Sequence, residues 1–256
     1  MRVLYVLTMA ILSLSVAGPA AAQSQITTGV IDGAVLDTSG AVLPGVDVEV
    51  RNIDTNLTRR LVTDREGRFV ALQLPPGRYT VTLKLPGFAS VVQENVIVTV
   101  GETVRLSPAM KVSGIAETVT VTTVTPAIEI TRTAAASTLD QTTIESTPIL
   151  GRKFEDLLTL TPGVSVVQGP DGDEITFSGQ RGVFNNISLD GGDYNNGFFG
   201  EQVGGQRAAI DITLEAVKEF QVIATGASAE FGRTAGGIVN VITKSGTNQV
   251  KGSLFH

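Results

Sequence analysis

Between Gly29 and Val112 the sequence alternates apolar and polar residues with a period of two. In "VDVEVRN", Val46, Val48 and Val50 share one face, and "RYTVTLKL" repeats the pattern. Successive side chains of a strand point to opposite faces, so this alternation is typical of half-buried strands. Turn-prone breaks such as "DTSG", "LPPG" and "VGE" separate them. The pattern predicts an all-β sandwich of six or seven short strands and about 85 residues.

The second half of the chain has a different pattern. "GRKFEDLLTLTPGV" places Phe154, Leu157 and Leu158 at helical spacing before a stop at Pro162. "EITFSGQRG", "NNISLDGG", "EFQVIATG" and "GGIVNVITK" read as short strands, with a brief helix at about 213–218. We therefore expect a small mixed α/β domain with long glycine-rich loops.

The N-terminus has the features of an export signal. Arg2 precedes the apolar run "VLYVLTMAILSLSVA", and "GPAAAQ" supplies small residues for cleavage after Ala22. An uncleaved anchor is the alternative, although the apolar run is short for a membrane span. The pattern predicts a Sec-type signal peptide and an exported product.

Composition argues against catalysis, metals and nucleic acids. The chain has no cysteine, and its one histidine is His256, the last residue. Thiol nucleophiles, histidine-based triads and most transition-metal sites are therefore excluded. The net charge of -6 argues against a nucleic-acid partner, which needs clustered basic residues. We expect no enzyme, no cofactor and no metal centre.

Three motifs that suggest chemistry fail on inspection. In "EFGRTAGGIVNVITKSGTN", Thr243 stands where a phosphate-binding loop needs glycine, and no helix start follows. In "GASAE", Glu230 replaces the second glycine of a serine-hydrolase elbow. The segment from Asp190 to Asn196 holds oxygen ligands that calcium accepts, but the EF-hand spacing fails. A cation site and a solvated loop both remain open for that segment.

A resemblance explains the order of the motifs. "GAVLDTSGAVLPGVDVEV", "TDREGRF", "LPPGRYTVTL" and "PGF" resemble the carboxypeptidase regulatory-like (transthyretin-like) sandwich. "LLTLTPGV", "SGQRG…NNISLDG", "TLEAVKEFQV" and "AEFGRTAGGIVNVITKSGTN" resemble, in order, the plug domain of TonB-dependent outer-membrane receptors. The two together match the Oar-like subgroup, and the matched segments span nearly all of the mature chain.

The resemblance implies several functional residues. "ETVTV" looks like the TonB box, which would pair by strand addition with the periplasmic energy-transducing protein TonB; one more sandwich strand or a plain linker is the alternative. Apical plug loops would hold the substrate, and the alternative is that they are ordinary solvated loops. For Arg181, pairing with a carboxylate of the barrel is a further alternative. Three glycines of the plug would allow tight backbone packing and positive φ, unless they belong to an ordinary turn and strand. The residues concerned are Glu117, Thr118, Val119, Thr120 and Val121 for TonB; Arg181, Asp190, Asp193, Tyr194, Asn195, Asn196, Phe198 and Phe199 for substrate; and Gly232, Gly236 and Gly237 for packing.

These observations predict the N-terminal portion of a TonB-dependent receptor that imports a small-molecule or oligomeric substrate through its own β-barrel in the cell outer membrane. The barrel itself is expected to be absent from this chain, either because the sequence is a fragment or because the gene is truncated. A secreted two-domain carbohydrate- or protein-binding adhesion protein is the alternative. The predicted divisions are 1–22 signal peptide, 27–112 sandwich, 113–124 linker with TonB box, 125–248 plug, and 249–256 start of the first barrel strand.

Overall fold

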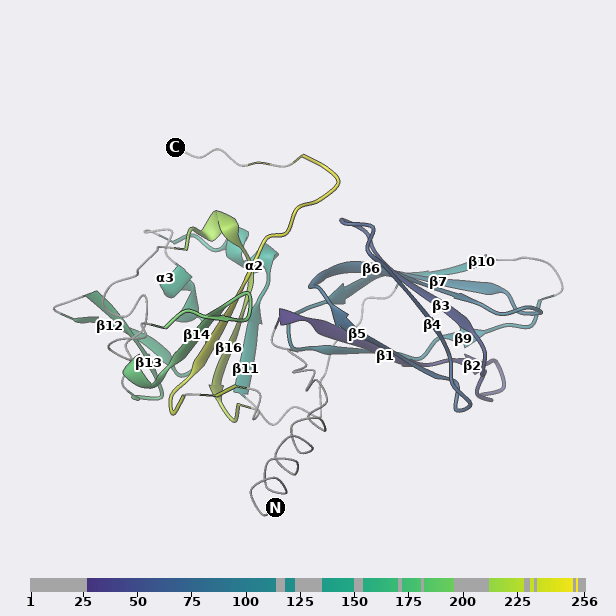
Figure 1. Ribbon diagram of the computed structural model, residues 1–256, viewed down its shortest axis with the longest axis horizontal. Coiled ribbons are helices and arrows are strands. Elements are labelled where there is room, and N and C mark those ends of the chain that lie inside the picture. The colour runs from purple at the N-terminus through teal and green to yellow at the C-terminus, as the bar shows by residue number, and fades with distance from the viewer. Residues whose placement is uncertain are drawn as a thin grey trace, which may run out of the picture.

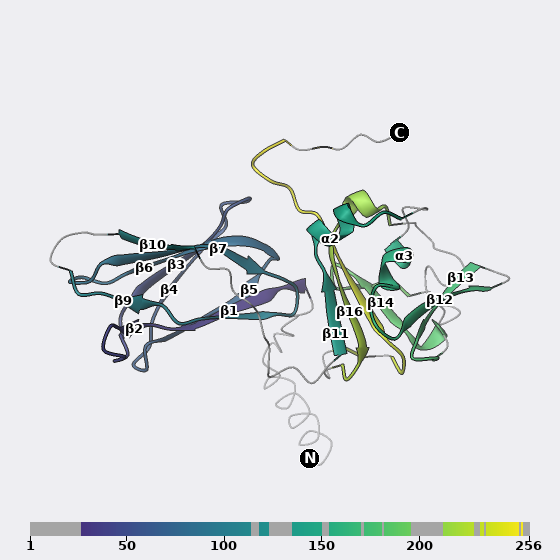
Figure 2. The same cartoon turned by 180° about the vertical axis from the view of Figure 1, so that it is seen from behind.

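The computed structural model describes residues 27–113, 118–122, 135–149, 154–169, 172–180, 182–195, 212–227, 231–232, 234–250 and 252. Within these ranges the chain forms two units that lie side by side, a β-sandwich followed by a mixed α/β domain (Figure 1; Figure 2). The predicted signal peptide lies outside the described residues. No helix in the described part of the chain is both long and apolar enough to cross a membrane.

The sandwich has two main sheets and a short pair of strands. One sheet has the order β10-β7-β6-β3-β4, the second β5-β1-β8, and β2 pairs with β9. Most neighbours are antiparallel, but β1–β8, β2–β9 and β10–β7 are parallel. The strands are β1 (Gly29–Ala34), β2 (Leu36–Asp37), β3 (Asp47–Asn52), β4 (Thr58–Val62), β5 (Arg68–Leu74), β6 (Gly77–Lys84), β7 (Ser90–Val98), β8 (Thr103–Leu106), β9 (Ala109–Met110) and β10 (Thr118–Thr122).

The predicted alternation forms the sandwich core. Val48 and Val50 of β3 lie beside Leu83 and Val81 of β6, and all four are buried. Strand β7 changes phase at Asn95, whose φ is 57°. The change coincides with a register irregularity against β6, so β7 keeps apolar residues on the core face on both sides of this bulge.

The second domain is built on a five-stranded sheet of order β11-β16-β17-β14-β15, with the hairpin β12-β13 beside it. Phe220 and Val222 of β16 and Val239 and Val241 of β17 point into a separate apolar core. The elements are β11 (Ala135–Leu139), α2 (Gln141–Ser146), α3 (Phe154–Leu158), β12 (Val164–Gly169), β13 (Gly172–Phe177), η2 (Gly182–Phe184), β14 (Asn186–Leu189), β15 (Gly192–Asp193), η3 (Leu214–Ala216), β16 (Val217–Thr225) and β17 (Ile238–Thr243).

The predicted fold class, an all-β sandwich followed by a small mixed α/β domain, is confirmed. The predicted helix at Phe154 is α3, and its three apolar residues are buried in the second core. The helix expected at 213–218 is only the short 3-10 helix η3, because β16 begins at Val217. Helix α2 was not predicted, since Ile144 is its one buried residue.

Candidate functional site

The candidate TonB box is an edge strand of the sandwich. β10 pairs in parallel with β7, from Thr118 opposite Ser90 to Thr122 opposite Glu94. The sequence left open a TonB box, one more sandwich strand or a plain linker, and in the structure the segment is a strand of the sandwich. Its position at the sheet edge leaves its other side open for strand addition. Glu117 lies outside the described residues.

Asp190 stands where β14 ends and fixes that end to β17. Its carboxylate accepts from the backbone N–H of Thr243 at 2.9 Å and from the Thr243 hydroxyl at 2.7 Å. Asp190 has φ 49°, so this aspartate holds a left-handed turn as well as two strands. Both of its oxygens are thus engaged within the domain.

Asn195 closes the hairpin that follows. Its Oδ1 accepts from the N–H of Ile187 at 3.1 Å, and its Nδ2 donates to Asn186 Oδ1 at 2.9 Å and to Asp193 Oδ1 at 2.7 Å. Tyr194 is half-buried and packs against the domain core. The side chains of Asn195 and Tyr194 therefore support the fold. A substitution at either position would change domain stability as well as any substrate contact. Arg181, Asn196, Phe198 and Phe199, also predicted to contact substrate, lie outside the described residues.

The three predicted packing glycines divide into two classes. A Cβ at Gly237 would overlap the Phe177 ring, and one at Gly236 would overlap the Asn185 amide and approach the Phe184 carbonyl. Gly236 and Gly237 therefore lie at positions of close packing within the domain. At Gly232 a Cβ would meet no atom within 4 Å, and none of the three glycines has a positive φ.

The two domains meet at strand β16. Glu219 Oε1 accepts from the Val100 N–H at 2.6 Å, and Gln221 Nε2 donates to the Val100 carbonyl at 3.2 Å. Both side chains are almost completely buried. Gly101, with φ 66°, packs so closely on the Gln221 amide that a Cβ would overlap it. The turn after β7 is therefore hydrogen-bonded, through both backbone groups of Val100, to one strand of the second domain.

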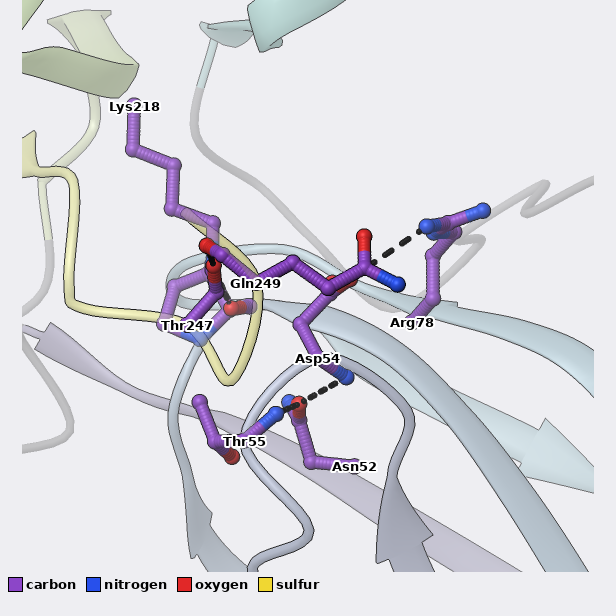
Figure 3. A network of polar contacts seen from close by, with 8 residues as sticks. Asn52, Asp54, Thr55, Arg78, Lys218, Thr247 and Gln249 are labelled. Carbon is purple, nitrogen blue, oxygen red and sulfur yellow. Dashed lines mark hydrogen bonds and ion pairs between the residues drawn. The ribbon is translucent and has the colours of Figure 1, made fainter. Parts of the chain in front are cut away.

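Two further contacts extend this junction. Lys218 Nζ donates to the Pro76 carbonyl, and the N–H of Asn248 donates to the Asp54 carbonyl at 3.2 Å. Figure 3 shows Lys218 and Asp54 in this region, where Asp54 also pairs with Arg78, with the nitrogen and oxygen 3.4 Å apart. A cleft of about 840 Å³ opens here, lined by the 52–57 loop, the 75–76 turn and the 244–250 segment.

Burial governs the ionisation of the charged groups at this junction. Burial raises the pKa of Glu219 to about 7, against the lowering effects of the Val100 N–H and of the Lys218 charge. Burial likewise lowers the pKa of Lys218, although Glu219 and Asp54 act in the opposite direction. The carboxyl group is thus poised to change protonation near neutral pH.

Among the described residues no group of three or more His, Cys, Asp or Glu side chains gathers in a way that would hold a metal ion. At the candidate cation loop, Asp190 is committed to Thr243 and Asp193 to Asn195. Their oxygens therefore serve the hairpin in this structure.

Comparison with known proteins places both domains. The family model "Carboxypeptidase regulatory-like domain" matches residues 30–111, and "TonB-dependent Receptor Plug Domain" matches residues 129–239. The chain is 28% identical over 235 residues to the TonB-dependent transporter Oar of Myxococcus xanthus, covering 88% of this chain. The chain carries a carboxypeptidase regulatory-like domain followed by a TonB-dependent receptor plug domain, and it is similar to an Oar-type TonB-dependent transporter. It spans 21% of the length of that curated relative.

Solved structures resemble this receptor segment only weakly. The wild-type catechol 1,2 dioxygenase of Acinetobacter radioresistens has 13% identity and a TM-score of 0.29, covering 40% of this chain and 60% of that chain. The Bacillus anthracis TIE protein has 24% identity and a TM-score of 0.29, covering 34% and 17%. The receptor and plug families are not enzyme families in general.

Sequence reasoning about this TonB-dependent receptor missed the junction residues Lys218, Glu219 and Gln221. They belong to the motif "TLEAVKEFQV", which was used only to identify the plug. One signal was available: Phe220 and Val222 alternate with Glu219 and Gln221, so the two polar side chains lie on the face of β16 away from the plug core, where they would be deeply buried only if another surface covered them. The covering surface, the turn at Val100, is too far away in sequence to be inferred.

Proposed function

We propose that this chain serves as the periplasm-facing, N-terminal part of an outer-membrane transporter whose import step is driven by TonB. The predicted domain divisions at 1–22, 27–112, 113–124, 125–248 and 249–256 are part of the proposal. The single observation that carries it is the position of β10: an alternating strand lies at the edge of a sandwich sheet and, in sequence, just before the plug. An edge strand is a natural acceptor for a strand from a partner protein.

The transport mechanism follows from this arrangement. Substrate bound on the outer face is sensed through the plug, TonB pairs with β10 in the periplasm, and pulling rearranges the plug to open a path through the barrel. In the exported, full-length receptor these two domains would lie in the periplasm or inside the barrel lumen. The comparisons do not favour the alternative, a secreted adhesion protein.

Proline scanning of β10 in the full-length receptor tests the TonB contact. Val119→Pro removes one backbone N–H and should abolish energised uptake while substrate binding remains. Val119→Ala keeps the N–H and serves as the matched control, with uptake close to wild type. Uptake by the proline variant equal to that of the alanine variant would disprove the assignment.

The substrate is proposed to contact the plug apex, within the loop that follows Asp190. Asp190 and Asn195 make hydrogen bonds within the domain and Tyr194 packs on its core, so substituting any of them would also disturb the fold. The informative variants are therefore Phe198→Ala and Phe199→Ala, each expected to weaken substrate binding by about 1–2 kcal/mol. Binding isotherms unchanged in both variants would move the substrate site to the extracellular loops of the barrel.

A further inference from the structure

The junction between the sandwich and the plug has the structure of a closed latch. Both backbone polar groups of Val100 are hydrogen-bonded to the plug strand β16: its N–H donates to Glu219 and its carbonyl accepts from Gln221. The partners lie 119 and 121 residues away in sequence. These bonds lie just after the end of β7, the strand with which β10 pairs.

We propose that Glu219 is a proton-operated latch: the sandwich docks firmly on the plug when this carboxyl group is protonated and loosens when it is ionised. This inference concerns how the two domains are held together. It does not depend on the proposed TonB contact or on any substrate.

The surroundings of Glu219 favour its neutral form. The side chain is 4% exposed, and an ionised carboxylate at that depth requires compensation by hydrogen bonds and by opposite charge. The Val100 N–H supplies one hydrogen bond. Lys218 is the one cation that acts on it among the described groups, but its ammonium group donates to the Pro76 carbonyl.

Two acidic groups act against the ionised form. Glu102 lies on the sandwich two residues after Val100, and Asp140 caps the start of α2 in the plug; both add negative charge near Glu219.

The direction of the pH effect follows. In the docked state the pKa of Glu219 is about 7, and in the undocked state solvent returns it towards the ordinary value of 4.5. Docking therefore takes up a proton between these two values, and it weakens as the pH rises from about 4.5 to about 7, with little further change above that. If undocking restores the ordinary value in full, the docking equilibrium changes about 30-fold between about pH 5.5 and about pH 8.

Amide hydrogen exchange of Val100, measured by NMR in the mature chain, reports latch opening directly. After correction for intrinsic exchange, we expect the Val100 protection factor to fall about 30-fold between about pH 5.5 and about pH 8, under conditions where reclosing outpaces exchange. The control amides are those of β3 and β6 around the pair Val48 and Leu83, in the core of the sandwich. Their corrected protection should stay constant.

Two variants make the test specific. Glu219→Gln keeps the shape and an acceptor oxygen but cannot ionise, so Val100 protection should become independent of pH. Glu102→Gln removes one neighbouring negative charge, so the protection loss should become smaller and shift to lower pH, without altering the latch bonds themselves. Constant Val100 protection in the wild type, or an unchanged pH dependence in Glu219→Gln, would overturn the proposal.

Discussion

Asp190 and Thr243 are joined by two hydrogen bonds across 53 residues, at 2.9 Å to the backbone N–H and 2.7 Å to the hydroxyl. The pair connects the turn after β14 to the last residue of β17. The parallel pairing of these strands ends beside it, at Leu189 opposite Val241. The aspartate therefore secures the end of a parallel pair, where no hairpin turn ties the strands together.

Replacing Asp190 by alanine should destabilise the plug by about 2 kcal/mol, because two hydrogen bonds are lost and alanine tolerates the left-handed φ poorly. Asp190→Asn is the matched control. Asparagine adopts this φ readily and keeps one acceptor, so its cost should be smaller. Urea unfolding followed by circular dichroism measures both, and equal stability of the two variants would contradict the role given to Asp190.

Asn195→Ala should lower plug stability by about 1–2 kcal/mol, because it leaves the Ile187 N–H without its acceptor and removes the donor to Asn186 and Asp193. Thermal unfolding should show the loss in the absence of any substrate. An unchanged melting temperature would show that the hairpin closes without this amide.

Gly237→Ala should cost about 1–3 kcal/mol, because its methyl group would enter the space of the Phe177 ring in the plug core. Gly232→Ala is the matched control in the same segment. Its methyl group meets open space, so stability should change by less than about 0.5 kcal/mol. Comparison of the two unfolding midpoints decides the point, and equal midpoints would count against close packing at Gly237.

The pairing of β10 with β7 can be trapped by a disulfide, because the chain contains no cysteine of its own. Thr120 and Val92 are directly opposite on the face away from the sandwich core, so Val92→Cys combined with Thr120→Cys should cross-link on mild oxidation. Glu49→Cys combined with Arg60→Cys is the positive control on the same sheet. Gel mobility under non-reducing conditions reports both; a cross-link in the control pair alone would show that β10 is not seated on β7.

The free energy of unfolding should decrease as the pH rises from about 4.5 to about 7. The folded state holds the Glu219 proton up to about 7, whereas the unfolded chain releases it near 4.5. The stability that protonation adds is fully present below the lower value and lost above the higher one, a total of about 3 kcal/mol. Glu219→Gln should remove this slope in urea titrations at several pH values. A slope unchanged in the variant would assign the effect to another group.

The sequence pattern predicted the sandwich because its strands are half-buried: the alternation around Val48 and Val81 maps directly onto the two faces of a sheet. Helix α2 was missed because five of its six residues are polar or exposed, although Asp140 three residues before Thr143 is an N-cap signal. The junction could not be predicted, because Glu219 and Val100 carry no local pattern that relates them. Gly232 was assigned a packing role by its residue type, and the type alone does not reveal which atoms surround a glycine.

The sequence separation of the contacts sets an order of assembly. The pairing of β10 with β7 joins residues that lie close together in the chain, all within the first 122 positions. The hydrogen bonds to Val100, in contrast, need residues 219 and 221. Domains fold as units from the N-terminal side as a chain emerges. As the chain emerges, the sandwich can therefore complete its sheet and pair β10 with β7 before the plug strands are available. The contact at Val100 comes last, so the sandwich is already a finished surface when the plug arrives to fold against it.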